Sequence, residues 1–101
     1  MAVSEANETI VKLVKTSLPG GITSTAHDEY FDLLVDDARE MIRKEGITLD
    51  DKNRSDQNLL VMYTSYLYRV RNEQTDTAMP RPLRYALNER IFSGGKSDET
   101  D

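Results

Sequence analysis

Four segments of the chain carry apolar residues three and four positions apart, the period of an amphipathic α-helix. No segment alternates apolar and polar residues over the length of a strand, so hairpins are not predicted. The pattern predicts an all-α fold, a small bundle of about four helices with a flexible C-terminal tail. The four segments cover approximately residues 4–18, 25–46, 55–72 and 79–92.

Capping and helix-breaking residues separate these segments. Proline and glycine at 19–21 end the first segment, because proline cannot continue a helix and glycine tolerates the turn. Thr25 is the expected N-cap of the second segment, and Gly46 its expected end. Pro80 and Pro82 suit the approach and first turn of the last helix. We expect one helical domain, residues 1–93, followed by a glycine-containing acidic tail, residues 94–101.

The centres of the apolar stripes predict the hydrophobic core, which is modest for a chain of 101 residues. Leu13 and Met41 also belong to the stripes of the first and second segments. The residues expected to be buried at the stripe centres are Leu34, Ala38, Leu60, Tyr63, Leu67, Leu83 and Leu87.

Composition argues against several classes of function. The net charge of −5 disfavours binding to nucleic acid by bulk attraction, and the absence of cysteine excludes thiolate chemistry. The single histidine, His27, precedes Asp28 and Glu29, a pattern typical of the first turn of a helix. Residues 50–58 lack the central glycine and closing glutamate of a calcium loop. We therefore expect no enzymatic activity, no cofactor and no metal. The N-terminus lacks a secretory signal and no segment is long and apolar enough to cross a bilayer, so a soluble protein without membrane contact is expected.

A basic cluster surrounds the connection between the third and fourth segments. It permits two interpretations, a nucleic-acid-binding helix-turn-helix or a surface for a protein partner. Residues 72–80 are too long for the usual helix-turn-helix turn, and residues 1–50 carry 5 basic against 10 acidic residues. The protein-partner interpretation is favoured, because tyrosine and arginine are enriched at interface hot spots. Tyr68 is expected to be exposed within this cluster. The cluster contains Tyr68, Arg69, Arg71, Arg81, Arg84 and Arg90.

The second segment has an acidic side formed by Asp32, Asp36 and Glu40. These residues are one helical turn apart, and on this side of the helix no apolar residue lies between them. Two interpretations stay open: an outer face that is simply solvated, or the wall of a channel from which DNA is repelled.

The order of the segments resembles that of the head–tail connector (adaptor, or head-completion) proteins of tailed bacteriophages. A short first helix "ETIVKLVKTSL" precedes an acid-led helix marked here by Asp28, Leu33, Leu34, Ala38 and Ile42. A long helix "LLVMYTSYLYRVRN" and a proline-led helix "MPRPLRYALNERI" follow. The likeness spans about residues 8–92, and the order and spacing of the helices carry it.

The resemblance implies a structural virion protein. Members of this family form a homo-oligomeric ring, commonly a dodecamer, beneath the portal protein, extend the DNA channel and bind downstream tail-joining proteins. DNA would pass through without sequence-specific binding. The protein would lie in the neck of the virion, and in the host cytoplasm during assembly. The alternatives are a small helix-turn-helix-like nucleic-acid-binding phage protein and an unrelated helical interaction module. In the family the C-terminal segment reaches the portal, and here that segment is about residues 92–101, with Ile91 and Phe92 as an apolar anchor before the tail. The residues expected to bind the portal are Ile91, Phe92, Ser93, Gly94, Gly95 and Lys96.

Overall fold

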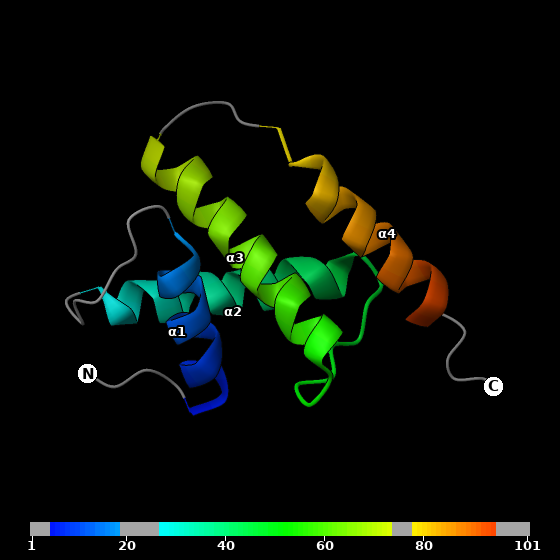
Figure 1. The fold of residues 1–101 in the computed structure, drawn as a ribbon, viewed down its shortest axis with the longest axis horizontal. Coiled ribbons are helices and arrows are strands. Elements are labelled where there is room, and N and C mark those ends of the chain that lie inside the picture. Colours follow the sequence, from blue (N-terminus) through cyan, green and yellow to red (C-terminus); the bar gives the residue numbers. More distant parts are fainter. Residues whose placement is uncertain (1–4, 19–26, 74–77, 95–101) are drawn as a thin grey trace.

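A computed structural model describes residues 5–18, 27–73 and 78–94, and all secondary structure in these ranges is helical. The prediction of an all-α fold with four helices is confirmed (Figure 1). The short 3-10 helix η1 (Glu5–Asn7) leads directly into α1 (Glu8–Ser17). The longer helices are α2 (Asp28–Lys44), α3 (Arg54–Glu73) and α4 (Arg81–Gly94).

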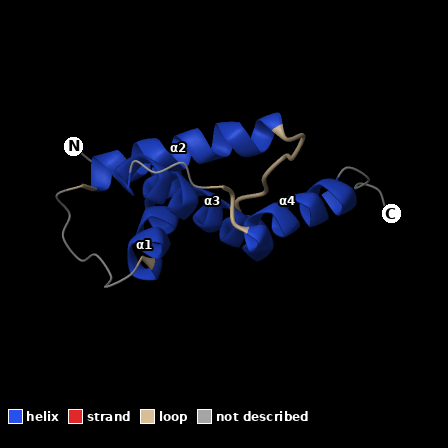
Figure 2. Cartoon of the chain, turned by 90° about the horizontal axis from the view of Figure 1, so that it is seen from above, coloured by secondary structure: helices blue, strands red, loops and turns tan. Residues whose placement is uncertain are grey.

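Helix α3 is the centre of the bundle and contacts each of the other three helices. Helices α1 and α2 pack against each other as well as against α3. Helix α4 lies beside α3, on the side away from α1, as the two views show (Figures 1 and 2). The arrangement leaves α4 with one main neighbour, so most of its surface faces outward.

The hydrophobic core forms where the apolar stripes of the helices meet. All seven residues predicted at the stripe centres are buried, from Leu34 on α2 to Leu87 on α4. Phe31, Val35 and Ile42 on α2 and Ile10, Val11 and Val14 on α1 complete the same core. Leu13 and Met41 lie at the edges of their stripes and are 41% and 40% exposed, so their assignment to the buried face is wrong.

The connection from α2 to α3 begins at Gly46, whose φ of 96° lies in the left-handed region that glycine adopts without strain. This conformation ends α2 as predicted, and Ile47 then enters the core. Asn53 precedes α3, and its side-chain Oδ1 accepts a hydrogen bond from the backbone N–H of Asp56 at 3.2 Å. Asn53 is therefore the N-cap, and α3 begins one or two residues earlier than the sequence indicated.

The last helix begins as the two prolines predict. The carbonyl of Pro80 accepts a hydrogen bond from the backbone N–H of Arg84. Pro82 lies in the first turn, where a backbone N–H would have no acceptor within the helix, so the lack of this group in proline costs no hydrogen bond. Helix α4 extends to Gly94, so its last residue lies one position beyond the expected domain boundary. Helix α2 begins at Asp28 with His27 at its N-cap position, so the prediction of Thr25 as the N-cap is wrong. Of the expected tail, residues 94–101, all but Gly94 lie outside the described residues.

Candidate interaction surfaces

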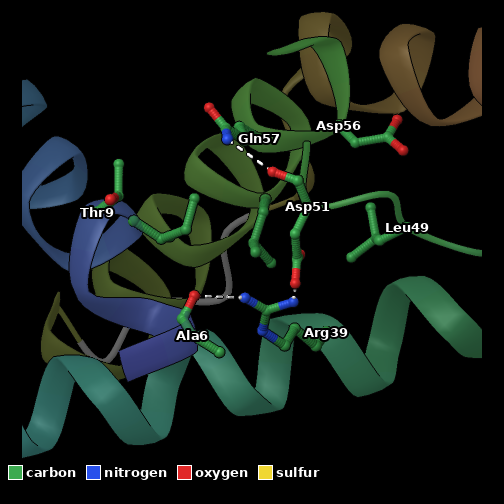
Figure 3. Close-up of a pocket in the computed structure, with 9 residues that line it drawn as sticks. Ala6, Thr9, Arg39, Leu49, Asp51, Asp56 and Gln57 are labelled. Carbon is green, nitrogen blue, oxygen red and sulfur yellow. Dashed lines mark hydrogen bonds and ion pairs between the residues drawn. The ribbon is translucent and has the colours of Figure 1, made fainter. Parts of the chain in front are cut away.

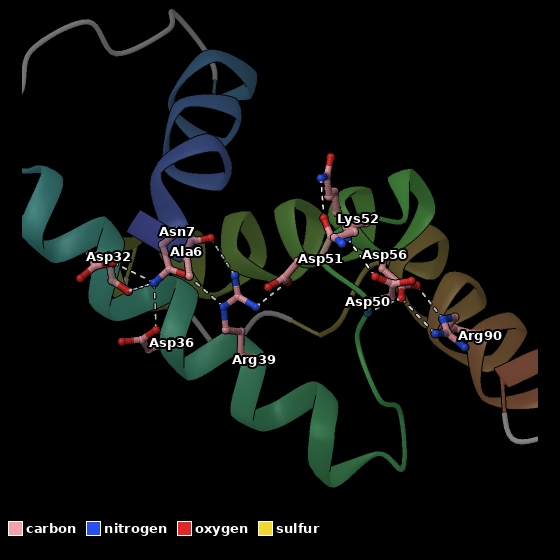
Figure 4. Close-up of polar contacts among 11 residues, drawn as sticks. Ala6, Asn7, Asp32, Asp36, Arg39, Asp50, Asp51, Lys52, Asp56 and Arg90 are labelled. Carbon is pink, nitrogen blue, oxygen red and sulfur yellow. Dashed lines mark hydrogen bonds and ion pairs between the residues drawn. The ribbon is translucent and has the colours of Figure 1, made fainter. Parts of the chain in front are cut away.

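The amide of Asn7 connects η1 to α2. Asn7 is 1% exposed, and its Nδ2 donates to Asp32 Oδ1 at 2.8 Å and to Asp36 Oδ1 at 2.9 Å (Figure 4). The two carboxylates stand one turn apart on α2 and repel each other. One amide group with two N–H donors relieves this repulsion and fixes the N-terminal segment against α2.

Arg39 completes this cluster from the next turn of α2. Its Nε donates to Asn7 Oδ1 at 2.9 Å, so every polar atom of the Asn7 side chain has a partner. Its Nη1 donates to Asp51 Oδ1 at 2.9 Å and its Nη2 to the carbonyl of Ala6 at 3.1 Å. Arg39 therefore joins three segments that are distant in the sequence: η1, α2 and the loop before α3.

A second buried cluster fixes α4. The carboxylate of Asp56 is 2% exposed and accepts from Arg90 in a bidentate geometry, with Nε at 2.6 Å and Nη2 at 3.0 Å (Figure 4). The backbone N–H of Asp50 also donates to Asp56, and Arg90 reaches the carbonyl of Thr48. The hydrogen bond from Asp56 stabilises the charged guanidinium and raises the pKa of Arg90.

Between these clusters lies a small cavity of about 110 Å³ (Figure 3). Its lining mixes apolar side chains with Arg39, Asp51, Asp56 and Gln57. Arg39 is bonded to Asp51, and Gln57 Nε2 donates to the backbone carbonyl of Asp51 at 2.7 Å. Arg39 is thus paired with Asp51 and Asp56 with Arg90, and these contacts hold the α2–α3 loop in place.

Three of the five arginines predicted at a ring or partner interface bind acidic groups of the same chain. Arg90 binds Asp56, Arg84 Nη2 lies 3.2 Å from Glu45 Oε2, and Arg71 Nη1 lies 2.8 Å from Asp37 Oδ2. Arg69 and Arg81 are exposed, and neither forms an ion pair with another residue of the described ranges. Within the described residues, Arg69 and Arg81 are therefore the members of this basic cluster whose charge is not paired.

Tyr68 is half-buried, so the expectation that it is exposed is wrong. Its ring stacks on Phe31 of α2 with centroids 5.2 Å apart and also contacts Tyr30 at 6.4 Å. Tyr68 lies at the edge of the α3 stripe, and the start of α2 covers it there. Its main contact is thus within the fold.

The acidic side of α2 is divided between two roles. Asp32 and Asp36 are bonded to Asn7, although Asp36 stays exposed. Glu40 is exposed and accepts hydrogen bonds from Arg43 on the next turn, which lowers the pKa of Glu40. The exposed negative charge of this side is partly compensated, which reduces its potential as a repulsive surface.

Exposed apolar side chains gather on the outward parts of α2 and α4. Leu33 on α2 is 62% exposed. On α4, Tyr85 and Phe92 are 67% and 75% exposed, and they stand seven residues apart, on one side of the helix. Their exposure is unusual for large apolar groups and marks α4 as a candidate contact surface.

An apolar groove of about 300 Å³ lies at the other end of α4. It is formed by the end of α1, the middle of α3 and the start of α4. Most of its surface is apolar, and the guanidinium-bearing Arg69 is its charged wall residue. The residues of the groove are Ser17, Leu18, Val61, Met62, Ser65, Arg69, Pro80, Pro82 and Leu83.

The residues predicted to reach a portal fall on both sides of the described end of the chain. Ile91 is half-buried and packs against the core, whereas Phe92 and Ser93 are exposed. Gly94 is the last residue of α4, and Gly95 and Lys96 lie outside the described residues. The apolar anchor expected before the tail therefore consists of one inward and one outward side chain.

Comparisons with protein-family models, with curated proteins and with solved structures found no match for this chain. Across the described ranges, no helix is long and apolar enough to cross a membrane. Nor do the described residues gather three or more metal-ligating acidic, histidine or cysteine side chains. His27 lies at the N-cap position of α2, in agreement with the interpretation of residues 27–29 as a helix start.

Sequence reasoning missed the charged connections between elements. Asn7, Asp56 and Lys15 are all buried, and Lys15 Nζ lies 2.6 Å from Asp28 Oδ1, across the α1–α2 connection. For Asp56 a local signal existed, because an asparagine three residues before an acidic residue is typical of a helix start. No local signal identified Arg90 as its partner, since 34 residues separate the two.

Proposed function

We propose that this chain is a structural virion protein, a head–tail connector that assembles as a ring under the portal. In this role it extends the DNA channel, binds the portal on one side and offers a surface to tail-joining proteins on the other. It would act in the neck of the virion after assembly in the host cytoplasm. The proposal assigns it no catalysis and no cofactor.

The observation that carries the proposal is the outward face of α4. A small domain whose last helix exposes Tyr85 and Phe92 is suited to bind other proteins. The four helices also follow one another in the order on which the connector resemblance rests. Both points favour an assembly subunit over a free-standing monomer.

The nucleic-acid-binding alternative receives less support. A duplex-binding surface needs several basic side chains free to reach phosphates. Here Arg71, Arg84 and Arg90 bind carboxylates of the same chain, so of the basic cluster only Arg69 and Arg81 lack an ion pair within the described residues, in a protein of net charge −5. We therefore place DNA in the ring channel, without sequence-specific contacts.

Sedimentation with portal rings of the same virus tests the connector role. The full chain should co-sediment with the portal, and electron micrographs should show a ring of added density at one portal face. A chain lacking residues 93–101 should keep its thermal stability, because the core residues of the described ranges all precede them, but it should bind the portal more weakly.

A matched control is Leu33→Ser on α2, which removes an exposed apolar group far from the end of α4. This variant should bind the portal if attachment resides in the C-terminal residues. Failure of the full chain to bind any portal ring, combined with a mobility shift on duplex DNA that weakens with salt, would favour the nucleic-acid-binding alternative.

A further inference from the structure

The apolar groove and the exposed Phe92 lie at opposite ends of α4. Pro82 and Leu83 line the groove in the first turn of α4, and Phe92 lies in its last turn. At about 1.5 Å per residue, the ten residues from Pro82 to Phe92 correspond to about 15 Å along the axis. Because α4 is one unbroken helix, its own Phe92 cannot enter this groove.

Phe92 also points away from the surface on which α4 packs. Leu83 is 1% exposed and faces α3, and Phe92 follows it by nine residues, which is about 180° around a helix of 3.6 residues per turn. Glu89 and Tyr85 share the side of Phe92, one and two turns earlier, respectively. We call this side, formed by Tyr85, Glu89 and Phe92, the α4 outer face.

The charges of the two surfaces are complementary. Glu89 is an exposed acidic group within the α4 outer face. Arg69 is an exposed basic group in the wall of the groove and forms no ion pair with the described residues. An apolar projection beside a carboxylate therefore matches an apolar recess beside a guanidinium.

We propose that the α4 outer face of one copy binds the apolar groove of a second copy, with Phe92 inserted between Met62, Ser65 and Pro82. Glu89 of the first copy then lies near Arg69 of the second. This contact rests on the proposed ring assembly and names the surfaces that join neighbouring subunits.

A contact between two different surfaces leaves each copy with one unused groove and one unused outer face. Such head-to-tail contacts propagate, and they close into a ring when the rotation between copies permits it. The surfaces are small compared with those of stable dimers, so one contact is weak in isolation. Closure stabilises the assembly, because each copy in a ring uses both surfaces.

Disulfide capture tests the contact directly, since the chain contains no cysteine. Phe92→Cys is mixed with Ser65→Cys, and the rate of covalent heterodimer formation is measured under a mild oxidant. We expect the heterodimer to form about tenfold faster than either homodimer, a preference equivalent to about 1.4 kcal/mol. Met62→Cys, also in the groove, should replace Ser65→Cys with the same result.

The matched control pairs Leu33→Cys with Ser65→Cys, because Leu33 is exposed to a similar degree but lies on α2. This pair should form heterodimers no faster than random collision produces. Circular dichroism of each variant confirms that the helices are retained. Equal rates for Phe92→Cys and Leu33→Cys, with either groove cysteine, would overturn the proposed contact.

Portal sedimentation of the unmodified chain separates this contact from the connector role. Portal binding without preferential cross-linking would leave the connector role intact and refute the contact. Preferential cross-linking without portal binding would support self-association and refute the connector role.

Discussion

Thr64 in the middle of α3 offers a sharp test of the packing. It is completely buried, and its hydroxyl oxygen has no hydrogen-bond partner in the structure of the described residues. A buried hydroxyl without a partner costs roughly 1–3 kcal/mol of stability, as protein mutations indicate. Thr64→Val replaces this hydroxyl by a methyl group of similar size.

The other contributions to this substitution nearly cancel. Threonine and valine have similar helix propensities, both are branched at Cβ, and they fill almost the same volume. We therefore expect Thr64→Val to raise the free energy of unfolding by about 1–2 kcal/mol. In a domain of this size that corresponds to an increase in Tm of roughly 4–15 °C.

Urea titration and thermal melting, both followed by circular dichroism, measure the effect. Thr16→Val is the matched control, because the Thr16 hydroxyl is exposed and donates to the carbonyl of Lys12 at 2.9 Å. This control should change stability by less than about 0.5 kcal/mol. A neutral or destabilising Thr64→Val would show that the hydroxyl is bonded in solution and refute the reasoning.

Substitutions at three further positions test the core and the attachment of α4. Leu67→Ala in α3 should lower the free energy of unfolding by about 2–5 kcal/mol, since Leu67 is buried, and a loss below half a kcal/mol in urea titration would contradict its place in the core. Arg90→Met should cost about 3–5 kcal/mol because it leaves the buried carboxylate of Asp56 unpaired, whereas Arg90→Lys, which keeps the charge, should cost less in the same titration. Burial raises the pKa of Tyr63, so the folded state retains the phenol proton more tightly than the unfolded chain; stability should therefore decline as the pH rises above about 10, and Tyr63→Phe should flatten that decline in melting curves recorded between neutral and alkaline pH.

Local patterns in the sequence were sufficient to predict the helices and the centre of the core. Apolar spacing reports which side of a helix is buried, and Leu34, Leu60 and Leu87 follow it because they lie in the middle of their stripes. The edges of the stripes were harder to predict. Met41 is exposed and Tyr68 is partly covered by Phe31. Whether a residue at the edge of a stripe is buried depends on how two helices cross and not on the period of one helix.

The charged connections escaped prediction for a related reason. Arg90 was assigned to a partner surface from its place in a basic cluster, but the fold brings it to Asp56 at the start of α3. Asn7 was assigned no role, although it bonds residues 25 and 29 positions later. Such pairs depend on the distance between helix ends in space, and neither residue type nor periodicity contains that information.

The attachment of α4 has a consequence for how the protein opens. Leu83 and Leu87 are its buried apolar residues, and Arg84 and Arg90 hold it through carboxylates outside the helix. Helices α1, α2 and α3 pack among themselves without α4. Amide protons of α4 should therefore exchange with solvent through a local opening, whereas those at the centres of α2 and α3 require global unfolding. A chain built in this way can reorient its last helix while the other three keep their shape.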